Sequence, residues 1–87
     1  MADNEPFQLS EHARRRIKQR RISATELRRA IANPDQSFAD EDDVELSHAI
    51  KQFRRAGTSR IVHVVYNHVV SPVRVVTAWL DRKMRKL

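Results

Sequence analysis

Arg20 is the residue whose type and position most directly suggest chemistry in this 87-residue chain. At about 100° per residue, Leu9, Ala13 and Ile17 form one apolar stripe of a helix, and Arg20 falls on that stripe. A guanidinium on a core-facing stripe is costly unless a carboxylate, carbonyl oxygens or a bound anion satisfies it. Two interpretations stay open: a buried ion pair, with Asp81 as the leading partner, or an anion site.

His12 adds an imidazole to this helix, one turn before Arg16 and two turns before Arg20. An imidazole exchanges protons near neutral pH, and neighbouring cations can hold a phosphate. This combination suits RNA cleavage without a metal, in which the 2′-hydroxyl loses a proton and the phosphorane needs fixed donors. A histidine in a first helical turn is also common as a plain surface residue.

Two further residues could take part in such chemistry. His48 alternates with Leu46 and Ile50, which is typical of a core histidine as well as of a catalyst. Thr77 interrupts a valine-rich segment, where its hydroxyl could orient a phosphate or bond across to His63. The histidines fit no zinc pattern and cysteine is absent, so we expect no metal and no cofactor.

Charge is distributed in three blocks along the chain. The net charge is +6, with basic blocks over residues 12–29 and 46–87 and an acidic block over residues 35–45. Two basic blocks in a small protein predict a polyanion partner such as RNA, with a solvated surface as the alternative. The candidate nucleic-acid-binding residues are Arg15, Arg16, Lys18, Arg54, Arg55 and Arg82.

Length and composition predict a single domain over residues 1–87, with residues 1–8 as a flexible N-terminus and 82–87 as a basic tail. The absence of cysteine excludes disulfides. The acidic start lacks a following apolar run, and no apolar run approaches the roughly 18 residues of a membrane span. We therefore expect a cytoplasmic protein that does not contact a membrane.

Helix signals are concentrated in the first third of the chain. One helix should start after Ser10, whose hydroxyl can accept from an early backbone N–H, and run to about Arg20. The second is marked by the capping box Ser23-Ala24-Thr25-Glu26 and should stop at Asn33-Pro34.

The remaining segments indicate a sheet. Residues 60–67 and 73–80 are rich in valine and should pair as an antiparallel hairpin, with His63 opposite Thr77 if the 68–72 loop is symmetric. Residues 44–55 fit either a helix or a strand, and we favour the strand because a hairpin needs a third partner. The predicted fold class is α+β, with two N-terminal helices packed on one face of a three- to four-stranded antiparallel sheet.

Two helices can cover only one face of such a sheet. The apolar face should lie beneath them; it carries Val62, Val64, Val76 and Ala78. The other face should stay open to a ligand, a second subunit or a protein partner; it carries His63, Asn67, Thr77 and Trp79.

The order of several short motifs resembles one known family. The motifs are Ser10-Glu11-His12-Ala13, Pro34-Asp35, Leu46-x-His48, Val64-Val65-Tyr66-Asn67, and Val75-Val76-Thr77-Ala78 followed by Asp81-Arg82. They resemble a small bacterial uncharacterised-domain family that is grouped with toxins of the barnase, EndoU, colicin and RelE ribonuclease fold. The match runs from Leu9 to Leu87.

The resemblance implies two helices on an antiparallel sheet and metal-independent RNA cleavage. It also implies functional positions at His12, Arg20, His48, Arg60 and Thr77. The chain departs from the family pattern at Arg21, where a turn-forming residue is usual, and at His63, where arginine is more frequent. Arg21 in left-handed geometry would cost on the order of 1 kcal/mol.

Three functions remain as hypotheses. The first is a toxin-like RNA-binding protein, with metal-independent RNA cleavage as a candidate activity and an antitoxin as a further candidate partner. The alternative is a non-enzymatic mobile-element or regulatory protein that binds protein or nucleic acid through the open sheet face and the charged segments, with a homodimer as a candidate assembly. The third is nucleic-acid binding by the basic helices without hydrolysis.

Overall fold

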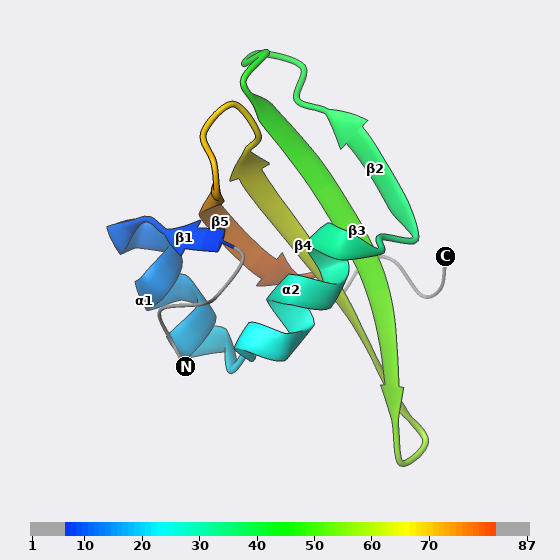
Figure 1. Ribbon diagram of the computed structural model, residues 1–87. Coiled ribbons are helices and arrows are strands. Elements are labelled where there is room, and N and C mark those ends of the chain that lie inside the picture. Colours follow the sequence, from blue (N-terminus) through cyan, green and yellow to red (C-terminus); the bar gives the residue numbers. More distant parts are fainter. Residues whose placement is uncertain (1–6, 82–87) are drawn as a thin grey trace.

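The computed structural model describes residues 7–81, with Arg55 described by its backbone alone. It is an α+β fold in which two helices lie on one face of a five-stranded sheet (Figure 1). The elements in chain order are β1 (Phe7–Leu9), α1 (Glu11–Arg20), α2 (Ala24–Ala32), β2 (Gln36–Ala39), β3 (Leu46–Arg55), β4 (Thr58–Asn67) and β5 (Val73–Leu80).

The sheet is larger than the three or four antiparallel strands predicted. Its order is β1-β5-β4-β3-β2, and it is mixed because β1 runs parallel to β5 while the other pairs are antiparallel. β1 contains Phe7 and Gln8, which the sequence analysis assigned to a flexible N-terminus. β2 follows α2 and occupies the far edge. Both missed strands are short, and strands of three or four residues carry little sequence periodicity.

Both helices begin and end where the sequence predicts. The Ser10 hydroxyl accepts from the Ala13 N–H at 3.0 Å, and Ser23 and Glu26 form both hydrogen bonds of the capping box. Arg21 closes α1 in the left-handed conformation (φ 55°, ψ 45°). Its neighbour Ile22 donates its N–H to the Ile17 carbonyl at 2.9 Å, which turns the chain toward α2.

The segment that fitted both a helix and a strand is the strand β3. β3 pairs with β4 along its whole length, from Leu46 opposite Asn67 to Arg55 opposite Thr58. It also pairs with β2 on its other side. Since β3 supplies backbone partners to two strands, pairing decides the conformation that the local pattern left open.

The predicted register of the β4–β5 hairpin is wrong by two residues. His63 lies opposite Trp79, and Thr77 lies opposite Val65. One residue of this difference arises at the loop, where Asn67 pairs with Arg74, and the second arises at a bulge between Val65 and Tyr66, where Val76 becomes the extra residue. Consequently Val75, not Val76, is buried in the core.

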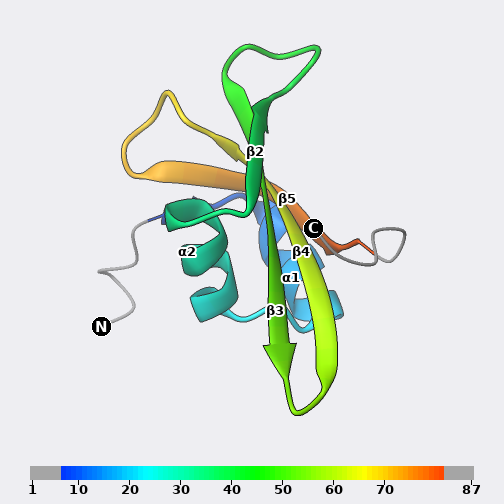
Figure 2. The same ribbon diagram turned by 90° about the vertical axis from the view of Figure 1, so that its right-hand side faces the viewer.

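The core lies between the helices and the sheet. Its buried members are Phe7, Ala13, Ile22, Leu27, Ala30, Val62, Val64, Val75 and Ala78. α1 packs on β5 and β1, whereas α2 packs on β4 and β3. The turned view shows both helices on the same side of the sheet (Figure 2).

The opposite face carries no helix, yet several of its side chains are buried. His63 is 7% exposed and Ile50 and Ile61 are each 4% exposed. The expectation that His63 lies open to a ligand is therefore wrong.

The two ends of the sheet differ. The β3–β4 hairpin turn projects beyond the helices at one end, and the loops at residues 40–45 and 68–72 lie at the other (Figure 1). Over the described chain, neither helix has the length and apolar character that crossing a membrane requires.

Candidate functional site: an arginine cleft

The five residues expected to act together in catalysis lie in separate places. His12 is exposed on α1, and Arg20 is the last residue of the same helix. His48 and Thr77 share a row of the helix-free face, each opposite Val65. Arg60 belongs to β4, where it contacts the start of α2. These residues do not form one site.

Arg20 is half-buried and forms no hydrogen bond or ion pair with residues 7–81. The expected pair with Asp81 is therefore not formed. A long side chain can cover apolar surface with its methylene groups while its charged end reaches water. This explains how Arg20 occupies the edge of the α1 stripe without a partner in the described part of the chain.

His12 does adjoin the cations that the sequence placed beside it. Arg16 donates from Nε to His12 Nε2 at 3.4 Å. Together with Arg15 and Gln19, these residues line a hollow of about 240 Å³. The predicted imidazole and guanidinium grouping is present, without Arg20.

His48 belongs to a hydrogen-bonded chain that we call the imidazole chain, composed of Asp40, His48 and His63. His48 Nε2 lies 2.6 Å from Asp40 Oδ1, and His48 Nδ1 lies 2.7 Å from His63 Nε2. An ionised carboxylate only accepts, so a neutral His48 donates to Asp40 and accepts from His63. His63 Nδ1 is then left as a buried acceptor without a hydrogen bond.

The pKa values of His63 and Asp40 in the imidazole chain follow from the contacts of these side chains. Burial, followed by the charge of His48, lowers the pKa of His63 to about 4. The hydrogen bond from His48 is the largest cause that lowers the pKa of Asp40. Asp40 Oδ2 accepts from the Asp42 and Asp43 N–H groups as well. With both oxygens engaged, Asp40 fixes the loop and orients His48.

Aromatic rings enclose the imidazole chain. The Phe38 ring stacks on His48 with centroids 4.7 Å apart, and the Trp79 ring stacks on His63 at 4.1 Å. Every nitrogen of His48 is bonded and His63 is buried, so this arrangement connects β2 to β3, β4 and β5.

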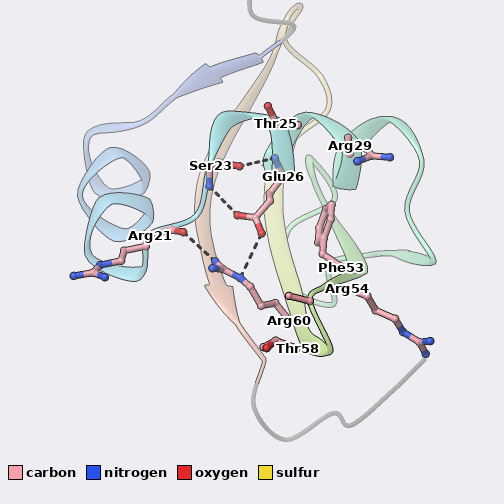
Figure 3. A pocket seen from close by; sticks show the side chains of 10 residues that line it. Arg21, Ser23, Thr25, Glu26, Arg29, Phe53, Arg54, Thr58 and Arg60 are labelled. Atoms are coloured by element: carbon pink, nitrogen blue, oxygen red, sulfur yellow. Dashed lines mark hydrogen bonds and ion pairs between the residues drawn. The ribbon is translucent and has the colours of Figure 1, made fainter.

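A cleft lies on the helix side of the sheet, at the end of the β3–β4 hairpin (Figure 3). It contains more cationic side chains than the His12 hollow or the imidazole chain. Its volume is about 690 Å³, and we call it the arginine cleft. It is lined by Arg21, Ser23, Thr25, Glu26, Arg29, Phe53, Arg54, Ala56, Thr58 and Arg60. Four of these residues are arginines and one is acidic.

Arg60 lies at the centre of the arginine cleft and is held in place by the helix turn (Figure 3). Its Nη2 donates to the Arg21 carbonyl at 3.0 Å, and its Nε lies 3.4 Å from Glu26 Oε2. Glu26 Oε1 in turn accepts from the Ser23 N–H at 2.9 Å. The capping box therefore positions Arg60 as well as starting α2.

Arg29 and Arg54 are two cations of the cleft that have no partner among the described residues. Both are exposed, and neither guanidinium bonds to any residue of the described range. Figure 3 shows them on either side of Phe53, with the Arg21 side chain pointing away from Arg60. Arg21 therefore takes part in the cleft through its carbonyl, which accepts from Arg60, rather than through its guanidinium.

Backbone strain is concentrated around this cleft. Within residues 7–81, the non-glycine residues with positive φ are Arg21 (55°) and Ala56 (51°), and both line the cleft. Each costs on the order of 1 kcal/mol relative to ordinary backbone. Such strain is concentrated at functional sites in proteins, which favours a function for this cleft.

The expected nucleic-acid-binding residues are divided between two surfaces. Arg15, Arg16 and Lys18 are exposed on α1, and Arg54 lines the arginine cleft. The Arg55 side chain and Arg82 lie outside the described residues.

Sequence reasoning missed Arg29 and Phe53 in the cleft and Asp40 in the imidazole chain. Arg29 follows the buried Leu27 by two positions on α2, and this spacing could have placed it on the exposed side.

Among residues 7–81, no three His, Cys, Asp or Glu side chains are grouped as a metal site requires.

Fold and cleft together define a small α+β protein with a cation-rich cleft between its second helix and a strand hairpin. The chain belongs to the family described as Domain of unknown function (DUF4258), whose model matches residues 9–80. No curated protein and no solved structure matches the chain.

Proposed function

We propose that this protein binds RNA, in the manner of a toxin-like protein, and that the arginine cleft is the binding site. The observation that carries the proposal is the placement of Arg29, Arg54 and Arg60 around one cleft with a single carboxylate, Glu26. Phosphate contacts by arginine supply most of the sequence-independent affinity for nucleic acid. The net charge of +6 favours the same class of partner.

The helix-free face is a poorer surface for RNA. Its imidazole chain includes Asp40, and its ring nitrogens are bonded or buried. A polyanion gains little next to the ionised carboxylate of Asp40, which repels phosphate. The cleft is therefore preferred to the face that the sequence analysis expected to be open.

The test removes Arg29 and Arg54, the two cations on either side of Phe53. In the double variant Arg29→Gln, Arg54→Gln, binding of a labelled single-stranded RNA should weaken, because two phosphate contacts are lost. The slope of log affinity against log salt should become shallower by about 0.7 for each lost contact. Fluorescence anisotropy over a salt series measures both quantities.

The matched control is Arg14→Gln, Arg74→Gln, which removes the same charge from exposed positions outside the cleft. This control should retain nearly all of the wild-type affinity. Equal weakening by both double variants would contradict a defined site and indicate binding to a diffuse basic surface.

Cleavage of RNA without a metal is a second candidate function, and the His12–Arg16 hydrogen bond favours it. In the hollow beside Arg15, His12 would accept the 2′-hydroxyl proton as that oxygen bonds to phosphorus, the guanidiniums would stabilise the phosphorane, and the bond to the 5′-oxygen would break as that oxygen takes a proton from His12 or water. This is the RNA cleavage expected from the sequence, except that Arg15 and Arg16 replace Arg20 as the residues that bind the phosphate.

Incubation of the pure protein with RNA in EDTA tests this second function. It predicts fragments ending in 2′,3′-cyclic phosphate, formed about 100-fold or more slowly by His12→Ala. His68→Ala, which changes an exposed histidine in a distant loop, serves as the control. Intact RNA after incubation with the wild-type protein would exclude cleavage under these conditions while leaving binding unaffected.

A further inference from the structure

We infer that the arginine cleft binds an unpaired nucleotide of an RNA strand, with the base against Phe53 and the phosphate on Arg60. This inference rests on the proposed RNA binding and specifies what the site selects. It predicts that the protein prefers single-stranded to double-stranded RNA.

The geometry that supports this inference is the pairing of β3 with β4. Phe53 lies directly opposite Arg60 in the antiparallel register. Residues in that relation keep their Cβ atoms about 5 Å apart on the same face of the sheet. Phe53 and Arg60 therefore extend from neighbouring positions of the sheet, and both side chains line the same cleft, where one could contact the base and the other the phosphate of one nucleotide.

The guanidinium of Arg60 is preorganised for binding a phosphate. The Arg21 carbonyl and Glu26 hold its Nη2 and Nε, and its Nη1 has no hydrogen bond to any of residues 7–81. The Arg60 side chain is 35% exposed, which leaves this free edge accessible. A preorganised guanidinium loses less conformational entropy on binding than a mobile one.

Phe53 supplies a partner for a base but not for a bare phosphate. Its ring is half-buried, packs against the core at one side and lines the cleft at the other. Single-stranded nucleic acids are held by basic grooves that also contain aromatic side chains. Bases of a duplex already stack on each other, so they cannot also stack on Phe53. The combination therefore selects unpaired nucleotides.

Phe53→Leu is the direct test. Anisotropy of a labelled short oligouridylate should show affinity reduced about fivefold or more, because base stacking on an aromatic side chain is lost. Phe53→Tyr retains the ring and should retain the affinity. The control is Phe38→Leu, which removes a ring that is 48% exposed on the opposite face and should leave binding unchanged.

Competition with unlabelled polyanions identifies what the cleft selects. The oligouridylate should compete better than the same strand in a duplex with oligoadenylate, and the affinity for inorganic polyphosphate should not change in Phe53→Leu. Thermal unfolding of each variant establishes that it is folded. If Phe53→Leu is unfolded, the wild-type preference for single strand over duplex decides the question.

The outcomes separate this inference from the proposed function. Wild-type affinity in Phe53→Leu, with loss of affinity in the Arg29 and Arg54 double variant, would overturn base stacking and retain RNA binding. Equal binding of duplex and single strand would also overturn it. Full affinity in the arginine double variant would overturn the proposed function itself.

Discussion

At the residue scale, the placement of each charge decides what it can do. Arg20 and Arg60 were both expected to bind phosphate, but only Arg60 has its guanidinium fixed by neighbours. His48 and His12 were both candidate acid–base residues, but both nitrogens of His48 are bonded and His12 is exposed. Accessibility and fixed geometry, rather than residue type, distinguish a binding group from a structural one.

His63 should make the stability of the fold depend on pH. Its pKa is about 4 in the folded protein, below the usual value of 6.5, because the ring is buried. Between these values the unfolded chain binds more protons, so the free energy of unfolding should fall as pH decreases from about 6.5 to about 4. The loss attributable to His63 should be up to about 3 kcal/mol.

Urea unfolding at pH 7 and at pH 4.5 measures this dependence. His63→Gln lacks the titrating group and should lose less stability than the wild type over that interval. Asp40 acts in a different interval, since its lowered pKa removes stability only below about its usual value of 3.8. An equal loss in the wild type and in His63→Gln would contradict the assignment to His63.

At the element scale, the turn between α1 and α2 connects stability to the cleft. Arg21 adopts a left-handed conformation that favours glycine, and its carbonyl accepts from Arg60. Glu26 completes the capping box and pairs with Arg60. One short segment therefore ends a helix, starts the next and positions the central cation of the cleft.

Arg21→Gly should stabilise the fold by about 1 kcal/mol, because glycine adopts positive φ without the strain of a Cβ atom. The carbonyl that accepts from Arg60 is retained. Lys18→Gly is the control, since it places glycine at an exposed position inside α1 and should destabilise by about 1 kcal/mol. Thermal unfolding compares both variants, and a destabilised Arg21→Gly would show that its side chain contributes more than the strain costs.

At the scale of the whole molecule, local signals were predictable and long-range pairing was not. The caps at Ser10 and Ser23 and the valine-rich strands depend on neighbouring residues, so the sequence indicated the α+β class and both helices. The edge strands β1 and β2 depend on partners far along the chain. The bulge at Val65 and Tyr66 shifted the register, which no local pattern specified.

The candidate site was predictable only in part for the same reason. Arg54 and Arg60 were identified from the basic blocks and the family resemblance. Phe53 and Arg29 join them because β3 pairs with β4 and α2 packs on both strands. The cleft therefore belongs to the tertiary structure, and its chemistry emerges from residues that are dispersed in the sequence.

The most direct measurement of the central claim is an NMR titration of the isotope-labelled protein with short single-stranded RNA. Binding in the arginine cleft predicts saturable shifts of amide signals around the cleft, at Glu26, Phe53, Ala56 and Thr58. Signals of Phe38 and His48 on the opposite face should remain unchanged. Shifts confined to that opposite face, or none at saturating RNA, would contradict RNA binding in the arginine cleft.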